Sequence, residues 1–219
     1  RLVITGDVYT YDYTDLQVTS FNPATTSFII SNAASATIKG AEIGLTAKPL
    51  DWLTVNAGIA YNEARFDDYL AQCWGGQTFE LGCSTSNGNG TFSWQRAGEA
   101  LSRAPDLTAN GGFNAQVPVG DFVLGLAGNV RYSDDYIAAD NGNPFGIQDA
   151  FWLLDAGLTF SPVSERWEVA VIGKNLTNEH YTAYIAEKPG APVVAGTTVQ
   201  LMGLANRTRQ VLLQASMKF

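Results

Sequence analysis

The sequence predicts an all-β fold, an antiparallel transmembrane β-barrel to which this chain contributes about eight strands. The final stretch, Arg209–Phe219, alternates between a mostly apolar face and a mostly polar face. This two-residue period is typical of a strand between an oily and a watery phase. The connections between the predicted strands alternate between tight turns and long loops, as in membrane barrels. No run of about 18 apolar residues occurs, so a transmembrane helix is excluded.

Eight segments carry the strand pattern in order along the chain. The first is the least regular, and the third is close to ideal, because apolar residues from Leu53 to Tyr61 alternate with small or polar ones. Each strand should therefore turn one face to lipid and one to the lumen. The predicted strands are Leu2–Val18, a segment ending at Lys48, Leu53–Asn62, Leu107–Val117, Phe122–Ser133, Trp152–Phe160, Arg166–Leu176 and Arg209–Phe219.

The lengths of the connections predict which end of the barrel carries short turns and which carries the long outer loops. A turn is expected around Phe21–Thr26, and tight turns at residues 49–51, 118–120 and 161–165. Long loops are expected at 67–98, at 134–148 and between Leu176 and Arg209. Membrane barrels have short turns on one side and longer loops on the outer side, whereas a soluble β-sandwich has no reason to sort loop lengths by end.

Aromatic residues fall in two groups that follow the same division. Rings of this kind prefer membrane interfaces, so the two groups predict two girdles. Trp52, Phe122, Phe160, Trp167 and Phe219 fall on the turn side, and Tyr61, Phe66, Tyr69, Tyr132, Tyr136 and Tyr181 on the loop side.

Composition narrows the class of protein. Hydrophobic residues make up 46% and charged residues only 16% of the chain, below the roughly 25% typical of soluble domains. The net charge of −8 argues against nucleic-acid binding. Arg1 leads directly into strand pattern without a signal peptide, so we expect the residues to begin inside a longer chain; a processed mature N-terminus is the alternative. Cys73 and Cys83 lie ten residues apart in a Gly/Ser/Asn-rich loop, which predicts a local disulfide.

The segment Val169–Tyr181 reads V-A-V-I-G-K-N-L-T-N-E-H-Y and resembles the penultimate-strand signature of TonB-dependent outer-membrane receptors, with its N-L-x-[DN]-x-x-Y core. Lys39–Glu42 and Arg103–Pro105 agree with that family in order and spacing, as do Arg207-Thr208 and the terminal Phe219. The resemblance spans essentially the whole chain, and the joint order of the motifs makes it specific.

The resemblance implies a barrel of 22 strands filled by an N-terminal plug domain. Residues 1–219 would then be the C-terminal portion of the barrel domain, with the plug and the N-terminal strands outside it. The implied protein is an active transporter of the bacterial outer membrane that imports a scarce ligand, such as a siderophore–iron complex, cobalamin or a saccharide.

The resemblance also implies partners. TonB is expected to act through the plug, and the barrel-assembly machinery to read the C-terminal strand, with Phe219 as the assembly signal. Outer-membrane lipid and lipopolysaccharide would surround the barrel, and nucleic acid is not expected as a partner.

Catalytic and metal sites find little support in the sequence. His180 has no serine or acid placed as a triad partner, and Gly173-Lys174 lacks the spaced glycines of a phosphate loop. The loop from Asp134 to Asn143 carries oxygens that calcium could use, but without the EF-hand spacing, and a solvated acidic loop is the preferred interpretation. We therefore expect no enzyme, no cofactor and no metal site.

The ligand-binding candidates come from the long loops, because the resemblance places the functional surface there. The alternative is that these side chains pack the loops on themselves or meet lipopolysaccharide. The candidates are Trp74, Phe79, Phe92 and Trp94 in the first long loop, and Tyr136 and Asn141 in the second.

Two rival interpretations remain. A complete eight-stranded barrel acting as an adhesin or structural anchor would fit the strand count, but its narrow interior would have to be filled by its own side chains. A soluble β-sandwich binding module would not explain the girdles.

The strand pattern also predicts which polar residues face the lumen. They are Glu42, Lys48, Asn56, Asn110, Asn114, Gln116, Asn129, Arg131, Asp155, Gln214 and Lys218.

Overall fold

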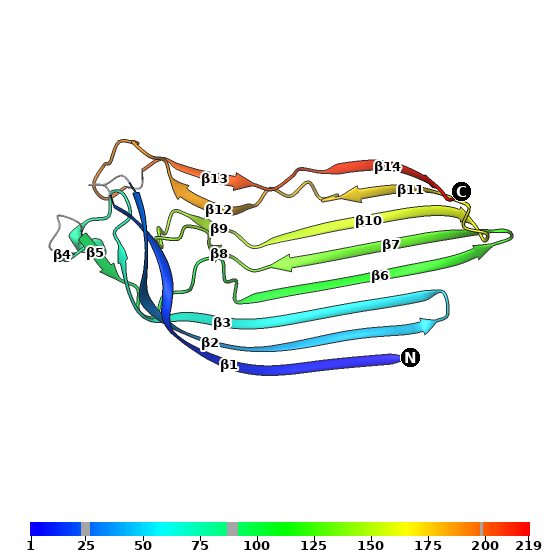
Figure 1. Ribbon diagram of the computed structural model, residues 1–219, viewed down its shortest axis with the longest axis horizontal. Helices are drawn as coiled ribbons and strands as arrows, with labels where there is room; N and C mark the ends of the chain where they lie inside the picture. Colours follow the sequence, from blue (N-terminus) through cyan, green and yellow to red (C-terminus); the bar gives the residue numbers. More distant parts are fainter. Residues whose placement is uncertain (23–26, 87–91, 198) are drawn as a thin grey trace.

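The computed structural model describes residues 1–22, 27–86, 92–197 and 199–219. Among these residues, eight long strands form the main path of one antiparallel sheet, in which each pairs with the next long strand of the sequence (Figure 1). The prediction of about eight antiparallel strands is confirmed. These strands are β1 (Leu2–Asn22), β2 (Ser27–Leu50), β3 (Leu53–Gln72), β6 (Leu107–Val119), β7 (Phe122–Ser133), β10 (Phe151–Pro162), β11 (Trp167–Lys174) and β14 (Gln210–Met217).

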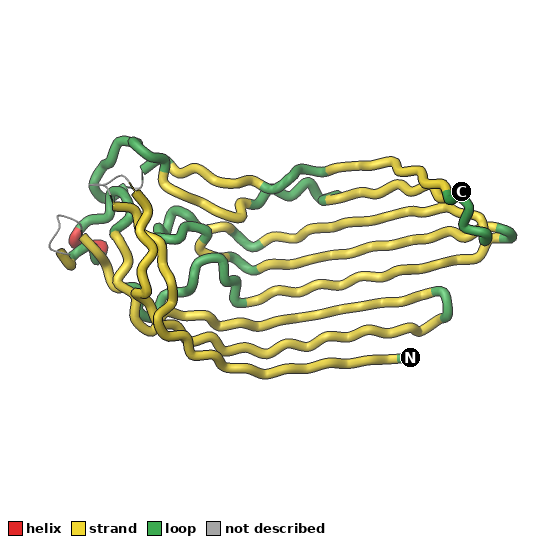
Figure 2. The backbone as a smooth tube through the Cα atoms, viewed as in Figure 1, coloured by secondary structure: helices red, strands yellow, loops and turns green. Residues whose placement is uncertain are grey.

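The connections are sorted by length, as predicted. Tight turns at residues 51–52, 120–121 and 163–166 lie at one end of the sheet, here called the turn end. The long connections gather at the opposite end, here called the loop end (Figure 2). The turn expected around Phe21–Thr26 includes residues 23–26, which lie outside the described residues. No helix among the described residues is long and apolar enough to cross a membrane.

The strand register places the apolar residues on one face. Leu45 pairs with Ile4 of β1 and with Ala57 of β3, and Leu126 pairs with Ala115 of β6 and with Leu158 of β10. The same phase continues to β14, where Leu213 pairs with Val171. Because side chains alternate along a strand, this outer face carries only apolar side chains and glycine over the middle of the sheet. The opposite, inner face carries the polar residues predicted for the lumen.

Aromatic rings frame the outer face. At the turn end Phe122 and Phe160 stack with ring centroids 4.9 Å apart, and Trp167 lies 5.9 Å from Phe160. At the loop end the ring centroids of Tyr132 and Trp152 are 4.7 Å apart. Eight residues separate Trp152 from Phe160, roughly 26 Å of strand at about 3.3 Å per residue. This length matches the apolar band of a transmembrane barrel, which is about 25 Å tall.

The outer face becomes charged where β1, β2 and β3 continue past the band. Lys39 of β2 pairs with Glu63 of β3 and with Thr10 of β1, on the same face as Ala41 and Ile43. Charged residues on a lipid-facing surface are costly, so the membrane boundary lies just before this pair. The loop ends of these three strands therefore project beyond the membrane.

The sheet is open, with β1 and β14 at its two edges. A complete eight-stranded barrel requires these two strands to pair, since closure is what removes the edges of a membrane sheet. The order of the described strands does not favour that alternative. It matches a segment of a larger barrel.

The loop end contains more structure than the sequence predicted. The loop expected at 67–98 begins late, because β3 continues to Gln72, and it holds the short helix η1 (Phe79–Leu81). The strands β4 (Thr85–Ser86) and β5 (Phe92–Gln95) also lie in it, and β5 pairs with β3. The other two long connections hold the pairs β8 (Tyr136–Ile137) with β9 (Ile147–Gln148), and β12 (Thr182–Glu187) with β13 (Leu201–Ala205).

Two aromatic residues assigned to the loop-side girdle are instead part of a core. Phe66 and Tyr69 are each only 6% exposed, and their ring centroids lie 4.8 Å apart. They pack with Ala34, Ala36 and Ala71, and with the partly buried Leu16, Val18, Trp94 and Leu101. The prediction failed because Phe66 lies in phase with Ala64 on the inner face of β3, not with the outward Glu63, and because β5 pairs with the end of β3 and brings Trp94 onto these rings.

Candidate functional site

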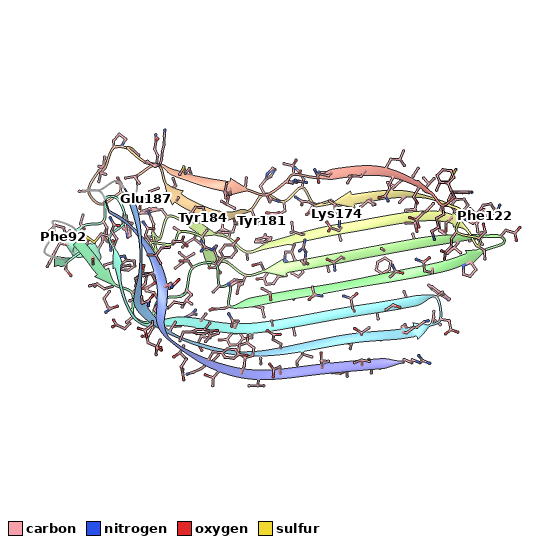
Figure 3. The ribbon with its side chains drawn as sticks, viewed as in Figure 1. Phe92, Phe122, Lys174, Tyr181, Tyr184 and Glu187 are labelled. Atoms are coloured by element: carbon pink, nitrogen blue, oxygen red, sulfur yellow. A yellow bond between two sulfur atoms is a disulfide. The ribbon has the colours of Figure 1, made fainter. Side chains whose placement is uncertain are left out.

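The long connections form a cluster at the loop end, and the predicted disulfide lies within it. Cys73 and Cys83 are bonded, with their Cα atoms 5.6 Å apart. The bond closes the segment that contains η1 and leaves Phe79 on its surface. Figure 3 shows the labelled Phe92 and Glu187 at this end, far from Phe122 at the turn end.

The six ligand-binding candidates divide into buried and exposed groups. Phe79 is 76% exposed and Phe92 is 52% exposed, so both rings are open to a ligand. Trp74 is only 4% exposed and packs edge-on against Phe145, with ring centroids 5.8 Å apart. Burial of Trp74 agrees with the alternative in which loop aromatics pack the loops on themselves.

Trp94 contacts a cation that belongs to the chain itself. Arg96 is fully buried, and its guanidinium carbon lies 4.9 Å from the Phe66 ring centroid, 5.8 Å from that of Tyr69 and 5.7 Å from that of Trp94. Its Nη1 donates to the Asp140 carbonyl at 3.1 Å and its Nη2 to the Ala100 carbonyl at 3.1 Å. Burial lowers the pKa of the Arg96 guanidinium. This aromatic box joins the first long loop to the second.

The two candidates from the second loop are held by hydrogen bonds to the third. The Tyr136 hydroxyl donates to the Thr182 carbonyl at 3.3 Å, and burial raises the pKa of this phenol. The Asn141 side-chain amide donates to Glu187 Oε1 at 2.8 Å. Tyr136 and Asn141 therefore link the second long loop to the third.

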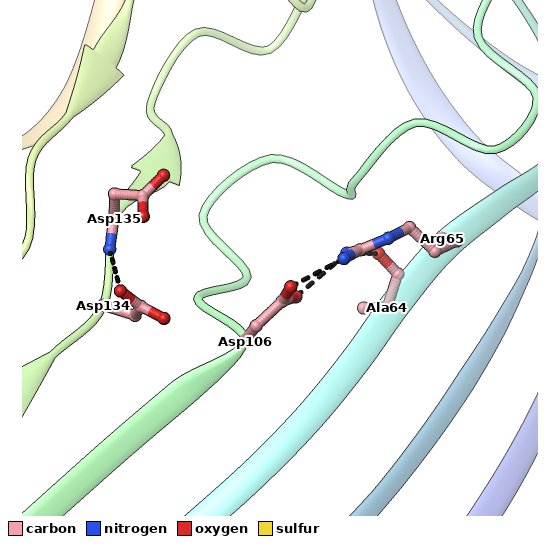
Figure 4. Close-up of polar contacts among 5 residues, drawn as sticks. All are labelled: Ala64, Arg65, Asp106, Asp134 and Asp135. Atoms are coloured by element: carbon pink, nitrogen blue, oxygen red, sulfur yellow. Dashed lines mark hydrogen bonds and ion pairs between the residues drawn. The ribbon is translucent and has the colours of Figure 1, made fainter.

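Ionic and hydrogen-bonded contacts fix the base of the cluster (Figure 4). Arg65 of β3 makes a two-pronged ion pair with Asp106, the residue just before β6, with N–O distances of 3.0 and 2.7 Å. Asp134 Oδ1 accepts hydrogen bonds from the Asp135 backbone amide at 3.1 Å and from the Tyr132 hydroxyl at 3.2 Å. Within the described ranges, no group of three His, Cys, Asp or Glu residues is placed to hold a metal ion.

The inner face of the sheet is polar and hollowed. One hollow of about 300 Å³ is lined by Thr5, Asp7, Glu42 and Asn110, next to Gly44 and Gly58. A second of about 430 Å³ lies farther along the sheet, over Asn114, Gln116, Asn129, Asp155 and Lys174. Lys174 Nζ lies 3.2 Å from Asp155 Oδ2. Side chains of this kind suit a water-filled path or a polar domain inside a barrel.

The N-L-T-N segment turns the chain out of β11. Asn175 has a φ of 49°, and its side-chain amide donates to the carbonyls of Glu179 at 2.8 Å and of Arg207 at 3.1 Å. The Asp155 carboxylate accepts the Asn175 backbone amide at 2.8 Å. The motif therefore has a structural role, joining β10, β11 and the approach to β14. Phe219 follows β14 and is fully exposed.

Arg96 and Glu187 were missed by sequence reasoning. Nothing in the local sequence indicates that Arg96 is buried. The rings that surround it come from two different strands, β3 and β5, which only the fold brings together. Glu187 lies 112 residues from Gly75, whose backbone amide it accepts. No local pattern could have placed these residues together.

Comparison with known proteins agrees with this architecture. The model of the family "TonB dependent receptor-like, beta-barrel" matches residues 1–176. No curated protein sequence matches the chain closely enough to count as a relative.

Several solved structures share the fold. The ferric yersiniabactin uptake receptor FyuA from Yersinia pestis is similar with a TM-score of 0.72 and 16% identity over 100% of this chain and 28% of that one. The siderophore receptor PiuA from Acinetobacter baumannii has a TM-score of 0.67 and 16% identity over 98% of this chain and 25% of its own. The copper transporter OprC has a TM-score of 0.62 and 18% identity over 100% of this chain and 29% of its own. The chain thus spans between 25% and 29% of the length of each of these proteins.

Proposed function

The chain belongs to the TonB-dependent receptor-like β-barrel family, and from that premise we propose that it forms part of an outer-membrane active transporter. The cargo would be a scarce ligand such as a siderophore–iron complex, cobalamin or a saccharide. In this proposal, residues 1–219 are the C-terminal portion of the barrel, and TonB acts through a plug domain outside these residues.

The observation that carries the proposal is the division of the sheet into two unlike faces. The outer face is apolar between two aromatic rims, which suits contact with lipid, and the inner face carries amides, carboxylates and the lysine Lys174 around two hollows. An open sheet with such an inner wall fits a barrel wide enough to enclose a polar domain and a transport path. Phe79 and Phe92 are the candidates that best fit direct ligand contact, because their rings are exposed at the loop end.

Two of the similar structures are a ferric yersiniabactin uptake receptor and a siderophore receptor, and a third is a copper transporter. These neighbours support a small, metal-containing cargo.

Uptake by cells with and without the receptor tests the proposal. Three labelled probes would be supplied at nanomolar concentration: a ferric chelate, cobalamin and a maltodextrin. We expect one of them to accumulate only when the full-length receptor and TonB are both present. The proposal would be contradicted if each of the three probes accumulated equally in cells with and without the receptor. Uptake that does not need TonB would also contradict it.

A further inference from the structure

The carboxylate of Glu187 joins three connections that are far apart in the sequence. Its Oε1 accepts the backbone amide of Gly75 at 2.9 Å, the side-chain amide of Asn141 at 2.8 Å and that of Asn143 at 3.2 Å. Gly75 lies in the disulfide-closed loop, the two asparagines lie between β8 and β9, and Glu187 ends β12. One oxygen atom is therefore the meeting point of all three long connections.

These three amide donors stabilise the negative charge of the Glu187 carboxylate. The ion pairs found among the described residues do not include Glu187, and its three donors are neutral amides. Hydrogen bonds to an ionised acceptor are stronger than those between neutral groups. A half-buried carboxylate without a cation is stabilised only while its donors stay in place, so each loop depends on the position of the other two.

Two glycines, Gly75 and Gly76, allow the disulfide-closed loop to approach the β12–β13 connection closely. A Cβ on Gly75 would lie 2.6 Å from Val199 Cγ1, and Gly76 has a φ of +87° with its Cβ position 1.8 Å from the Thr197 carbonyl oxygen. The Gly196 amide donates to the Gly76 carbonyl at 2.8 Å. Only a Gly-Gly step allows the disulfide-closed loop to pass this close to the β12–β13 connection.

The asparagines are prearranged in a similar way. The Asn141 side-chain oxygen accepts the Asn143 backbone amide at 3.2 Å, and the Asn143 side-chain oxygen accepts the Phe145 backbone amide at 3.0 Å. These bonds turn both side-chain amides toward Glu187. Phe145 in turn packs against Trp74, which precedes Gly75.

We infer that Glu187 is a positioning residue that latches the described parts of the three outer connections together, so that the position of each depends on the other two. The latch orders Trp74, Asn141 and Phe145 without requiring Glu187 to touch a ligand. Its part in ligand capture rests on the proposed function, whereas the latch itself does not.

Hydrogen–deuterium exchange on the full-length receptor in detergent micelles tests the latch without any ligand. We expect Glu187→Ala to raise exchange at least several-fold in peptides that cover residues 73–78 and 139–146, although neither segment is altered. Glu187→Gln keeps the shape of the acceptor without its charge and should give an intermediate rise.

Lys188→Ala is the matched control, because the side-chain bond that Lys188 makes among the described residues stays within its own hairpin, to Gln200 Oε1 at 3.1 Å. It should raise exchange only around residues 182–205. Heat-modifiable gel mobility would confirm that each variant retains a folded barrel. If Glu187→Ala changes exchange only in residues 182–205, or resembles Lys188→Ala, the latch is overturned. Because no ligand is used, this outcome is independent of whether the uptake experiment succeeds.

Discussion

The guanidinium carbon of Arg96 lies 4.9 Å from the ring centroid of Phe66, so a buried cation is held over an aromatic face at the loop end of the sheet. Trp94 and Tyr69 complete the box, and two backbone carbonyls accept the guanidinium hydrogens. This contact joins the wall of the barrel to the loops above it. Trp94 therefore has a structural role, packing against Arg96, that its position in the sequence does not indicate.

Replacing Arg96 should loosen the loops and leave the barrel intact. Arg96→Met fills the space but removes the charge and leaves the Asp140 and Ala100 carbonyls without their donor, a loss of about 2–4 kcal/mol of local stability. Limited proteolysis should then cut within residues 92–105, while heat-modifiable mobility of the barrel is unchanged. Arg103→Met, which removes a half-exposed ion pair with Asp140 and a cation–π contact with Tyr184, is the control and should cost only about 1 kcal/mol. Equal protection in the Arg96→Met variant and the wild type would disprove this role.

Removing the disulfide should have an effect confined to the loop. A short closed loop contributes about 2–3 kcal/mol by restricting the unfolded chain. The double variant Cys73→Ser, Cys83→Ser should therefore show faster amide exchange in residues 73–86 and an unchanged barrel melting temperature. A fall in the melting temperature of the whole barrel would show that the bond stabilises more than the loop.

The two faces of β7 should tolerate a charged side chain to very different degrees. Leu126 faces outward between the aromatic rims, and its neighbour Ala127 lines the inner hollow. Leu126→Arg places a cation in lipid near mid-band and should destabilise the barrel by about 2–4 kcal/mol. Ala127→Arg at the same height should cost much less. Urea unfolding in lipid vesicles measures both, and equal losses would contradict the assignment of the faces.

The sequence was sufficient for the sheet because a membrane barrel is built from local rules. Alternation from Leu53 to Tyr61 determines which side chains meet lipid, and short turns such as the one at residues 120–121 fix strand register. The loop cluster obeys no such rule. Burial of Phe66 and Tyr69, and the meeting of Gly75 with Glu187, follow from contacts between distant segments that leave no periodic pattern. The disulfide was the exception, since its partners are only ten residues apart.

The exposed aromatics should matter for ligand capture more than the buried ones. Phe79→Ala and Phe92→Ala should each weaken capture of the imported probe by about tenfold, because a stacked aromatic contact is worth on the order of 1 kcal/mol or more. Neither substitution should alter proteolysis of the loops. Trp94→Ala should loosen the loops first, because its ring packs on Arg96. Unchanged uptake in both phenylalanine variants would remove these residues from the ligand site.

Deleting Phe219 should reduce the amount of assembled barrel. This prediction rests on the role of assembly signal that the family resemblance implies for Phe219, which follows β14 and is exposed. We expect the deletion to lower heat-modifiable receptor in outer-membrane fractions several-fold, while Lys218→Ala, which removes only an exposed ion pair with Glu165, leaves the amount unchanged. Normal assembly of the deletion variant would refute the role of Phe219 as an assembly signal.

The central claim is that this open sheet is a segment of a large transporter barrel, and the intact mass of the native protein in the outer membrane tests it most directly. The chain has a mass of 23.5 kDa and spans 28% of the FyuA receptor. We predict a native mass roughly three to four times that of the chain, as expected when a plug and further strands complete the barrel. A native mass near 23.5 kDa would require β1 and β14 to close on each other, and would contradict the transporter assignment.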